Sequence, residues 1–492
     1  MSIILALDQS TSATKALLFD TEGTLLDKAA IEHRQYYPQP GWVEHDAEEI
    51  FQNTLRVCSA LLEKNPSVQG DLLCLSLTNQ RETIVVFDRE TGAPLHHAIV
   101  WQCRRGDLIC EDLVRAGHAR RVQQSTGLKI DTYFPASKLK WLFDNQPGIL
   151  QRVGAGEALI GTIDTYLIYR LTRGQVFASD STNASRTLLY DIGHLRWDDE
   201  LCELFGVPMA ALPEVRESSA QFGETDLGGL LANPIPICGV MGDSQAALFA
   251  ERCLVPGSAK VTFGTGSSVL LNIGDQFKLS ERGIVTTIGW VHRGRVTYAF
   301  EGIINFTGAT IQWLRDQLQL IASAAETEAL ARMVADNGGV YVVPAFVGLS
   351  APYWRADVKG AIVGLTPAAT KAHVVRAALE SIAYQVKDVL DLMAEDARVD
   401  LQFVHADGGA VRNRFLMQFT ADMVRRTIRA SDLPELSALG AVLSGALGMG
   451  IYRSPEELEA LPQRFLDYEP MMEDRLVEKY YAGWRAAVRQ VL

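Results

Sequence analysis

The stretch IILALDQSTSATKALLF, residues 3–19, predicts how the chain begins to fold. Its apolar start indicates a buried strand that ends at Asp8, and residues 16–19 indicate the hairpin partner of that strand. Residues 24–26 indicate a third strand. The loop between the first two strands, residues 8–15, is rich in hydroxyl groups and short in side-chain bulk. Such a loop can point backbone N–H groups and hydroxyls at phosphate oxygens.

A similar unit recurs past the middle of the chain. Residues 259–263 indicate a strand, residues 264–268 a turn of small residues, and residues 269–272 the partner strand. Another apolar strand, residues 235–240, leads to Asp243. Because strand, hydroxyl-rich turn and strand occur in both halves, we expect two related domains that face each other across a cleft.

Length and periodicity agree with two domains of the α/β class. A chain of 492 residues is too long for one ordinary core. Residues 372–393 have apolar residues at helical spacing, and strands alternate with helices along the chain. We place the domains at residues 1–245 and 246–492.

Composition excludes several classes of protein. Hydrophobic residues make up 48% and charged residues 21%, which is typical of soluble globular proteins. No apolar run is long enough to cross a bilayer, and the N-terminus lacks the pattern of a secretory signal, so we expect a cytoplasmic protein. A net charge of −13 argues against a nucleic-acid or membrane partner. The seven cysteines show no metal-ligand spacing and predict reduced thiols.

Two aspartates that follow apolar strands predict phosphoryl-transfer chemistry. A Walker loop is absent, so the two hydroxyl-rich turns are the available phosphate sites, although Gly, Ser and Thr are also common in ordinary hairpins. One of Asp8 and Asp243 can hold Mg²⁺, and the other can accept the proton of an attacking hydroxyl. Asp243 can alternatively be a helix cap for residues 244–249.

Other residues suit a polyol and a nucleotide. Arg81 and Glu82 offer donors and acceptors side by side, as a vicinal diol requires, but an adjacent Arg and Glu can also be a surface ion pair. Trp101 and Tyr133 would add an aromatic wall, or pack in a core. Residues 407–410 let the backbone approach a flat ligand such as adenine, or form a plain turn.

The sequence resembles the FGGY carbohydrate kinases over nearly its whole length. Residues 133–145 fit the first signature of that family, and residues 360–365, followed by His373 and residues 378–380, fit the second. Longer stretches resemble the glycerol kinase branch of the family: residues 40–46, 78–83, 98–105, 341–346 and 349–354.

The resemblance implies two ribonuclease-H-like domains in an actin/hexokinase-like fold with a deep cleft. It implies ATP- and Mg²⁺-dependent phosphorylation of a terminal hydroxyl of a small polyol, with Asp243 as general base, and homodimers or homotetramers. The metal residues would be Asp8 and Asp243. The polyol residues would be Arg81, Glu82, Trp101, Tyr133, Asp243, Ser244 and Ser268. The nucleotide and phosphate residues would be Thr11, Ser12, Ala13, Lys15, Thr265, Gly266, Gly308, Gln312, Gly409, Ala410 and Asn413.

Departures from the family pattern affect the expected substrate. Ser244 replaces a glutamine, and Ser268 replaces a phenylalanine that packs on the carbon chain of glycerol, so the pocket is wider and more polar. A four- or five-carbon polyol or ketose is the alternative substrate. Lys15 stands where arginine is usual and loses the planar fork. Residues 228–234 lack the pattern that binds fructose 1,6-bisphosphate, so we expect no inhibition by that effector.

A non-catalytic, sugar-responsive regulator is a remote alternative. It would need a way to contact DNA or another partner, and the sequence contains no DNA-binding module or basic arm. Both aspartates are also present.

Overall fold

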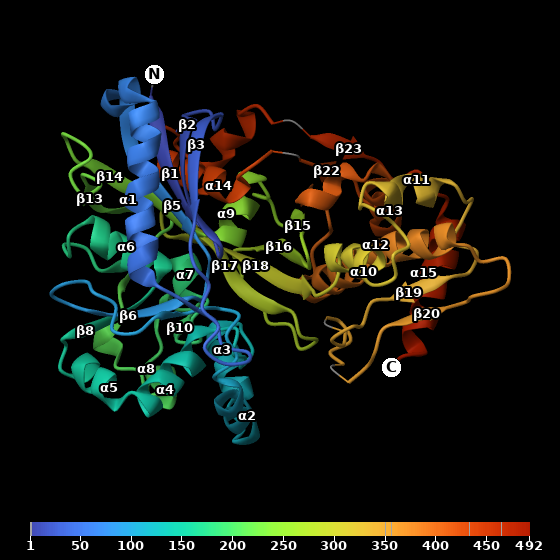
Figure 1. The fold of residues 1–492 in the computed structure, drawn as a ribbon, viewed down its shortest axis with the longest axis horizontal. Helices are drawn as coiled ribbons and strands as arrows, with labels where there is room; N and C mark the ends of the chain where they lie inside the picture. Colours follow the sequence, from blue (N-terminus) through green and yellow to red (C-terminus); the bar gives the residue numbers. More distant parts are fainter. Residues whose placement is uncertain (1, 350, 356, 432, 464) are drawn as a thin grey trace.

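Two β-sheets dominate the computed structural model, one in each half of the chain (Figure 1). The N-terminal sheet has six strands in the order β13-β14-β5-β1-β2-β3. The structure describes residues 2–349, 351–355, 357–431, 433–463 and 465–492. The N-terminal sheet consists of β1 (Ile3–Gln9), β2 (Ala13–Asp20), β3 (Leu25–Glu32), β5 (Leu72–Asn79), β13 (Gln221–Thr225) and β14 (Ile235–Gly242).

The C-terminal sheet repeats this arrangement. Its seven strands follow the order β17-β18-β16-β15-β21-β22-β23. In each sheet three neighbouring strands pair antiparallel, β1-β2-β3 and β15-β16-β18, and the C-terminal sheet adds β17 beside β18. One strand, β5 or β21, pairs parallel with the first of them, and the next strand, β14 or β22, pairs parallel with β5 or β21 in turn. The predicted duplication is therefore confirmed. The strands are β15 (Ala259–Phe263), β16 (Ser267–Gly274), β17 (Val285–His292), β18 (Arg295–Ile304), β21 (Val404–Asp407), β22 (Ile428–Ala430) and β23 (Leu466–Tyr468).

The N-terminal half contains further strands and helices besides its six-stranded sheet. They include a second sheet in the order β4-β7-β6-β8. Their strands are β4 (Glu44–His45), β6 (Ile84–Asp88), β7 (Ala98–Ile99), β8 (Ala158–Thr162), β9 (Ala178–Asp180), β10 (Tyr190–Asp191), β11 (Arg196–Trp197) and β12 (Glu214–Arg216). Their helices are α1 (Ala47–Lys64), α2 (Asp107–Arg115), α3 (Ala119–Thr126), α4 (Pro135–Asn145), α5 (Pro147–Gly154), α6 (Ile163–Leu171), α7 (Ser181–Ala184), α8 (Asp199–Phe205) and α9 (Asp243–Ala250).

Helices also cover the C-terminal sheet, and a two-stranded sheet of β19 (Tyr341–Val343) and β20 (Ala361–Val363) lies near α12 and α15. The helices of this half are α10 (Gly308–Asp316), α11 (Glu326–Arg332), α12 (Lys371–Ala397), α13 (Arg414–Val424), α14 (Leu436–Gly448) and α15 (Asp474–Arg489). Ser350, which belongs to the 349–354 motif, lies outside the described residues.

Strand β1 is buried on both faces, which explains its unbroken apolar sequence. Side chains of a strand alternate between faces. Leu5 and Leu7 accordingly pack in a cluster with residues of α1 and α6, whereas Ile4 and Ala6 pack with residues of α14. Helix α14 follows a strand of the C-terminal sheet but covers the N-terminal sheet.

Helix α9 does the reverse and packs on the C-terminal sheet. It follows β14 of the N-terminal sheet, but Leu248 and Phe249 pack in one cluster with Leu270 and Trp290 of the C-terminal sheet. The two crossing helices also contact each other directly. A Cβ atom on Gly440 of α14 would overlap the carbonyl oxygen of Ala246 in α9. The halves are thus joined by a backbone-to-backbone helix contact.

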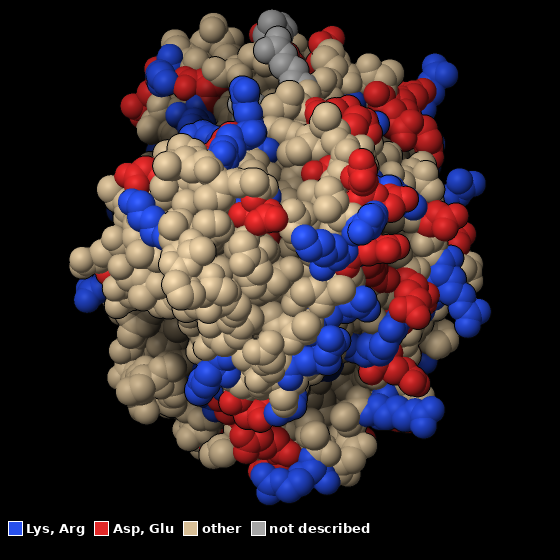
Figure 2. Space-filling view, turned by 90° about the vertical axis from the view of Figure 1, so that its right-hand side faces the viewer, with Lys and Arg blue, Asp and Glu red and all other residues tan. Residues whose placement is uncertain are grey.

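Figure 2 shows the side of the molecule formed by the C-terminal half. Lys and Arg side chains lie among Asp and Glu side chains there, and a broad uncharged area lies beside them. Among the described residues, no helix combines the length and the apolar composition that crossing a bilayer requires.

The close contact at Gly440 makes a testable prediction. Gly440→Ala should lower the free energy of unfolding by about 1–3 kcal/mol, because the added methyl group forces α9 and α14 apart. Chemical denaturation followed by circular dichroism measures the change. Gly148→Ala is the matched control, because a Cβ on this helical glycine meets no atom within 4 Å. Equal stabilities of the two variants would contradict the packing described here.

Candidate active site

Asp8 and Asp243 line one cavity of about 420 Å³ between the two sheets. Asp8 lies near the end of β1, and Asp243 is the first residue of α9. Ser244 and Ser268, at the two positions that depart from the family pattern, line the same cavity. The pairing of acidic strand ends that the sequence indicates is therefore present in the fold.

Asp8 is a buried carboxylate with one cation beside it. Lys15 lies opposite Asp8 across the β1–β2 ladder, and its Nζ is 3.1 Å from Asp8 Oδ2. Burial raises the pKa of Asp8 to about 6, although Lys15 opposes that rise. Lys15 Nζ also lies 2.6 Å from Glu435 Oε2, at the start of α14. The carboxylate therefore favours further positive charge in the cavity.

Asp243 is held by two donors on one oxygen. Its Oδ1 lies 3.1 Å from Arg81 Nε and accepts a 2.7 Å hydrogen bond from the backbone N–H of Ser244. The side chain is 40% exposed. Gly242, not Asp243, is the N-cap of α9, so the carboxylate is not explained as a helix cap. It is fixed in orientation and still open to the cavity.

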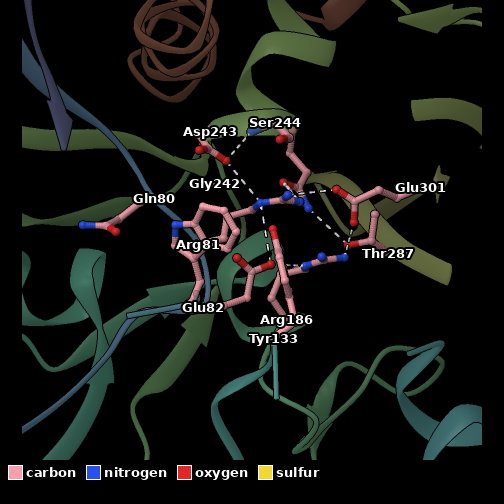
Figure 3. Close-up of polar contacts among 12 residues, drawn as sticks. Gln80, Arg81, Glu82, Tyr133, Arg186, Gly242, Asp243, Ser244, Thr287 and Glu301 are labelled. Atoms are coloured by element: carbon pink, nitrogen blue, oxygen red, sulfur yellow. Dashed lines mark hydrogen bonds and ion pairs between the residues drawn. The ribbon is translucent and has the colours of Figure 1, made fainter. Parts of the chain in front are cut away.

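Arg81 and Glu82 belong to a buried charge cluster (Figure 3). Arg81 Nη2 lies 2.8 Å from Glu301 Oε1. Glu82 Oε1 accepts a 2.6 Å hydrogen bond from Arg186 Nε, and Arg186 Nη1 lies 2.5 Å from Glu301 Oε2. None of these four side chains is more than 5% exposed. The interpretation of Arg81 and Glu82 as a surface ion pair is therefore wrong.

The electrostatics of this cluster keep Glu301 ionised. Burial alone would raise the pKa of Glu301, but Arg186 and Arg81 outweigh burial and hold the pKa at about 2. Burial also raises the pKa of Tyr133, whose ring lies 5.9 Å from the Arg186 guanidinium. The cluster is thus charged internally, with a neutral phenol at its edge.

Trp101 and Tyr133 form an aromatic pair beside this cluster. Their ring centroids are 5.2 Å apart, and both residues border a further cavity of about 510 Å³. Trp101 Nε1 donates a 3.0 Å hydrogen bond to Thr11 Oγ1, which belongs to the first hydroxyl-rich loop. The aromatic wall therefore connects directly to the predicted phosphate loop.

Lys138 holds the backbone of both aromatic residues. Its Nζ donates hydrogen bonds of 3.1 Å to the carbonyl oxygen of Trp101 and 3.0 Å to that of Tyr133. Lys138 is completely buried, and burial lowers the pKa of its amine to about 7. Since no carboxylate is bonded to Nζ among the described residues, the amine acts here as a donor that fixes two backbone segments.

Six of the predicted nucleotide residues line one cavity of about 680 Å³ in the C-terminal half. It lies between β15, α10, α11, α12 and the turn before α13. Gly266, in the turn from β15 to β16, accepts a 2.9 Å backbone hydrogen bond from Gly264. The six residues are Thr265, Gly308, Gln312, Gly409, Ala410 and Asn413.

The remaining predicted phosphate residues form the tight turn from β1 to β2. Ser10 donates its backbone N–H to the carbonyl of Ala13 at 2.9 Å, which closes the turn. Ser12 accepts a 3.1 Å backbone hydrogen bond from His33 of the following segment. In the described structure the turn thus places Thr11 beside the aromatic wall and Lys15 beside Asp8.

Lys138, Arg186 and Glu301 are site residues that sequence reasoning missed. Glu301 carried a signal, because it is a charged residue inside the apolar strand β18. Lys138 lies in the first signature stretch, but nothing in its spacing indicates a bond to two carbonyls. Arg186 lies among small polar residues without a periodic pattern. The role of each depends on contacts between distant segments.

Lys138→Met should destabilise the fold by about 1–3 kcal/mol at pH 7, because two buried carbonyls lose their donor. The pKa of Lys138 in the folded state is below that of a free lysine, so the unfolded chain binds more protons between pH 7 and about 10. Stability from this amine therefore rises with pH, and the deficit of the variant should grow by up to about 1.4 kcal/mol per pH unit above 7.

Denaturation midpoints at pH 7, 8 and 9 measure the trend. Lys140→Met is the control on the same helix, since Lys140 makes a partly exposed ion pair with Asp144. A deficit for Lys138→Met that is flat or shrinks with pH would contradict the depressed pKa.

Apart from β17, the two sheets share one strand order, α9 and α14 each pack on the sheet of the other half, and a cavity lies between the sheets. These features define an actin/hexokinase-like protein with two ribonuclease-H-like domains. Residues 3–250 match the N-terminal domain, and residues 259–449 the C-terminal domain, of the FGGY family of carbohydrate kinases. The chain belongs to this family and is a kinase.

Several glycerol kinases resemble the chain over its full length. It is 47% identical to glycerol kinase 1 of Thermotoga maritima over 489 residues, which cover 99% of each chain. It is 46% identical to the glycerol kinase of Desulfitobacterium hafniense, again over 99% of each chain.

Solved structures show the same architecture. A crystal structure of Plasmodium falciparum glycerol kinase with ADP superimposes with a TM-score of 0.95 at 35% identity, covering 100% of this chain and 98% of that one. A xylulose kinase from Lactobacillus acidophilus superimposes with a TM-score of 0.88 at 21% identity, covering 99% of each chain, and shows the shared fold.

Proposed function

We propose that this protein transfers the γ-phosphoryl group of ATP to a terminal hydroxyl of a small polyol, with glycerol as the first substrate to test. The observation that carries the proposal is the shared cavity of Asp8 and Asp243 between the duplicated sheets. Full-length similarity to proteins named glycerol kinase supports the choice of glycerol.

Asp243 is the general base of the proposed reaction. Both of its donors contact Oδ1, so Oδ2 has no bonded partner in the described part of the chain. That oxygen can accept the proton of the attacking hydroxyl as the new P–O bond forms and ADP leaves. Arg81 keeps the carboxylate in one orientation, which reduces the cost of positioning at the moment of transfer.

The polyol would bind against Arg81 and Glu82. The guanidinium donates and the carboxylate accepts, so together they can satisfy neighbouring hydroxyls of a diol. Trp101 and Tyr133 would cover the carbon chain. In this arrangement residues 1–245 supply most of the polyol contacts and the first phosphate loop, and residues 246–492 supply the second phosphate loop and the other nucleotide contacts.

Mg²⁺ fits the donor set of the cavity. Hard oxygen ligands suit this ion, and a buried carboxylate with a raised pKa gains from a nearby cation. Asp8 and Asp243 are the residues that would hold it. When bound, Mg²⁺ would neutralise charge on the phosphate oxygens, a need that is acute in a chain of net charge −13. Lys15 would add a fixed cation on the same side.

The nucleotide would bind in the cavity of the C-terminal half. Thr265, Gly308, Gln312, Gly409, Ala410 and Asn413 would hold it there, with Thr11, Ser12, Ala13 and Gly266 on the phosphates. Assembly into homodimers or homotetramers, the cytoplasmic location and the absence of fructose 1,6-bisphosphate inhibition stay predictions.

Asp243→Asn tests the base. The variant should lose about 10²–10⁴-fold in kcat with unchanged thermal stability, because an amide cannot accept the hydroxyl proton. A coupled assay of ADP release with glycerol and MgATP measures the loss. Asp199→Asn is the control, since Asp199 is also the first residue of a helix, α8. Turnover by Asp243→Asn within tenfold of the wild type would show that another group removes the proton.

One observation favours a longer substrate as the second candidate. Among the described residues, Ser268 Oγ is buried and has no hydrogen-bond partner, and Ser268 lines the cavity that Asp8 and Asp243 share. A buried hydroxyl without a partner is unfavourable, and an additional substrate hydroxyl would satisfy it. The space left by a serine in place of phenylalanine suits a four- or five-carbon polyol or ketose.

Ser268→Phe should shift kcat/KM towards glycerol relative to erythritol, threitol, xylitol, ribitol and xylulose by about 10-fold or more, because the ring fills the space for extra carbons. Ser268→Ala separates the effect of losing the hydroxyl from the effect of filling the space, since it removes the hydroxyl without adding bulk. A shift of Ser268→Phe towards the longer substrates, or no shift, would refute this account of the pocket.

A further inference from the structure

The C-terminal sheet supplies Glu301 to the buried charge cluster that contains Arg81 and Glu82. Glu301 lies on β18, which pairs with β16 and β17, whereas Arg81 and Glu82 follow β5 of the N-terminal sheet. In Figure 3 Glu301 approaches from the side opposite Gln80 and Glu82 and reaches the two arginines. The polyol site thus depends on a contact between the halves.

Glu301 divides its carboxylate between two arginines. Oε1 lies 2.8 Å from Arg81 Nη2, and Oε2 lies 2.5 Å from Arg186 Nη1. The side chain of Glu301 is 1% exposed, so both ion pairs are shielded from water. Shielding strengthens the attraction and leaves no solvent to replace a lost partner.

Each arginine holds a residue of the proposed reaction through another nitrogen. Arg81 uses Nε to hold Asp243 at 3.1 Å, and Arg186 uses Nε to hold Glu82 at 2.6 Å. The planar guanidinium transmits orientation from one nitrogen to the next, because its donors are fixed relative to each other. Glu301 therefore orients Asp243 through Arg81, and it orients Glu82 through Arg186.

Nearby polar groups cannot take over from Glu301. Arg81 Nη1 donates a 3.1 Å hydrogen bond to Gln245 Oε1, and Gln245 in turn donates to Thr287 Oγ1 at 3.1 Å. These partners are neutral. Without the Glu301 charge, two buried guanidinium groups would face each other, and each would turn towards the remaining carboxylates, Glu82 and Asp243.

We infer that Glu301 is a positioning residue for the polyol, through which the C-terminal half sets the orientation of Arg81, Glu82 and Asp243. This inference rests on the proposed function. It assigns Glu301 and Arg186 to the recognition of the alcohol, not to that of the nucleotide, because all of these contacts lie on the polyol side of the site.

The test is Glu301→Gln, assayed with MgATP and the best substrate of the polyol panel. Gln has the same shape but presents an amide N–H group to one of the arginines. We expect KM for the polyol to rise about 10- to 100-fold and KM for ATP to change less than about threefold. Glu380→Gln is the control, because Glu380 is also a buried carboxylate, bonded to Arg376 Nε at 2.7 Å. It should leave KM for the polyol within about twofold.

Glu301→Asp gives a second test if Glu301→Gln does not fold. It keeps the charge but is too short to reach both arginines, so KM for the polyol should rise at least fivefold. Equal rises of both KM values, or an unchanged KM for the polyol in an otherwise active enzyme, would overturn the inference and leave the proposed function standing. A wild-type protein that phosphorylates no polyol or ketose would overturn both.

Discussion

The contact between helices α9 and α14 is the constraint on which the site depends. Each helix belongs by sequence to one half and packs on the sheet of the other half. Because Gly440 has no Cβ, the two helices approach to backbone contact. Asp243 begins α9 and Glu435 precedes α14, so this contact brings Asp243, the Lys15–Glu435 ion pair and Asp8 to one cavity.

Charge is distributed so that an acidic protein can bind a polyphosphate. The cations of the site are few, and most are buried or partly buried. Lys15 forms an ion pair with Asp8, whereas carboxylates within their own cluster neutralise Arg81 and Arg186. Lys260, also buried, donates to Thr262 Oγ1 at 2.6 Å beneath the shared cavity. In the proposed function, the phosphates would therefore be bound by backbone donors, Lys15 and Mg²⁺.

Much of the fold could be predicted from the sequence because local patterns decide it. The run from residue 3 to residue 19 gives a strand, a tight turn and a strand, and its repetition after residue 259 indicates the duplication. The resemblance to a known family also gave some of the residues that line each cavity, among them Asp8, Asp243, Thr265 and Asn413. The packing of α9 and α14 on the sheet of the other half could not be predicted. Apolar periodicity shows that a helix has a buried face, but it does not identify the sheet that the helix covers.

The role of Glu301 could not be predicted for a related reason, because its partners lie far away in the sequence. Glu301 and Arg81 are 220 positions apart in the sequence, and only the tertiary structure brings them to hydrogen-bond distance. The reading of Arg81 and Glu82 as a surface pair failed because it considered the dipeptide without its distant partners. For Ser268 the sequence indicated the missing bulk, and the structure added that its hydroxyl is buried and has no hydrogen-bond partner in the part of the chain that is described.

A crystal structure of the complex with a polyol, Mg²⁺ and a non-hydrolysable ATP analogue tests the central claim most directly. The proposed reaction predicts a terminal hydroxyl of the polyol about 2.6–3.2 Å from the Asp243 carboxylate. It also predicts the nucleotide in the cavity lined by Thr265, Gly409 and Asn413, with its terminal phosphate directed to the space between Asp8 and Asp243. A polyol bound away from Asp243, or a nucleotide outside that cavity, would show that the reaction does not take place as proposed.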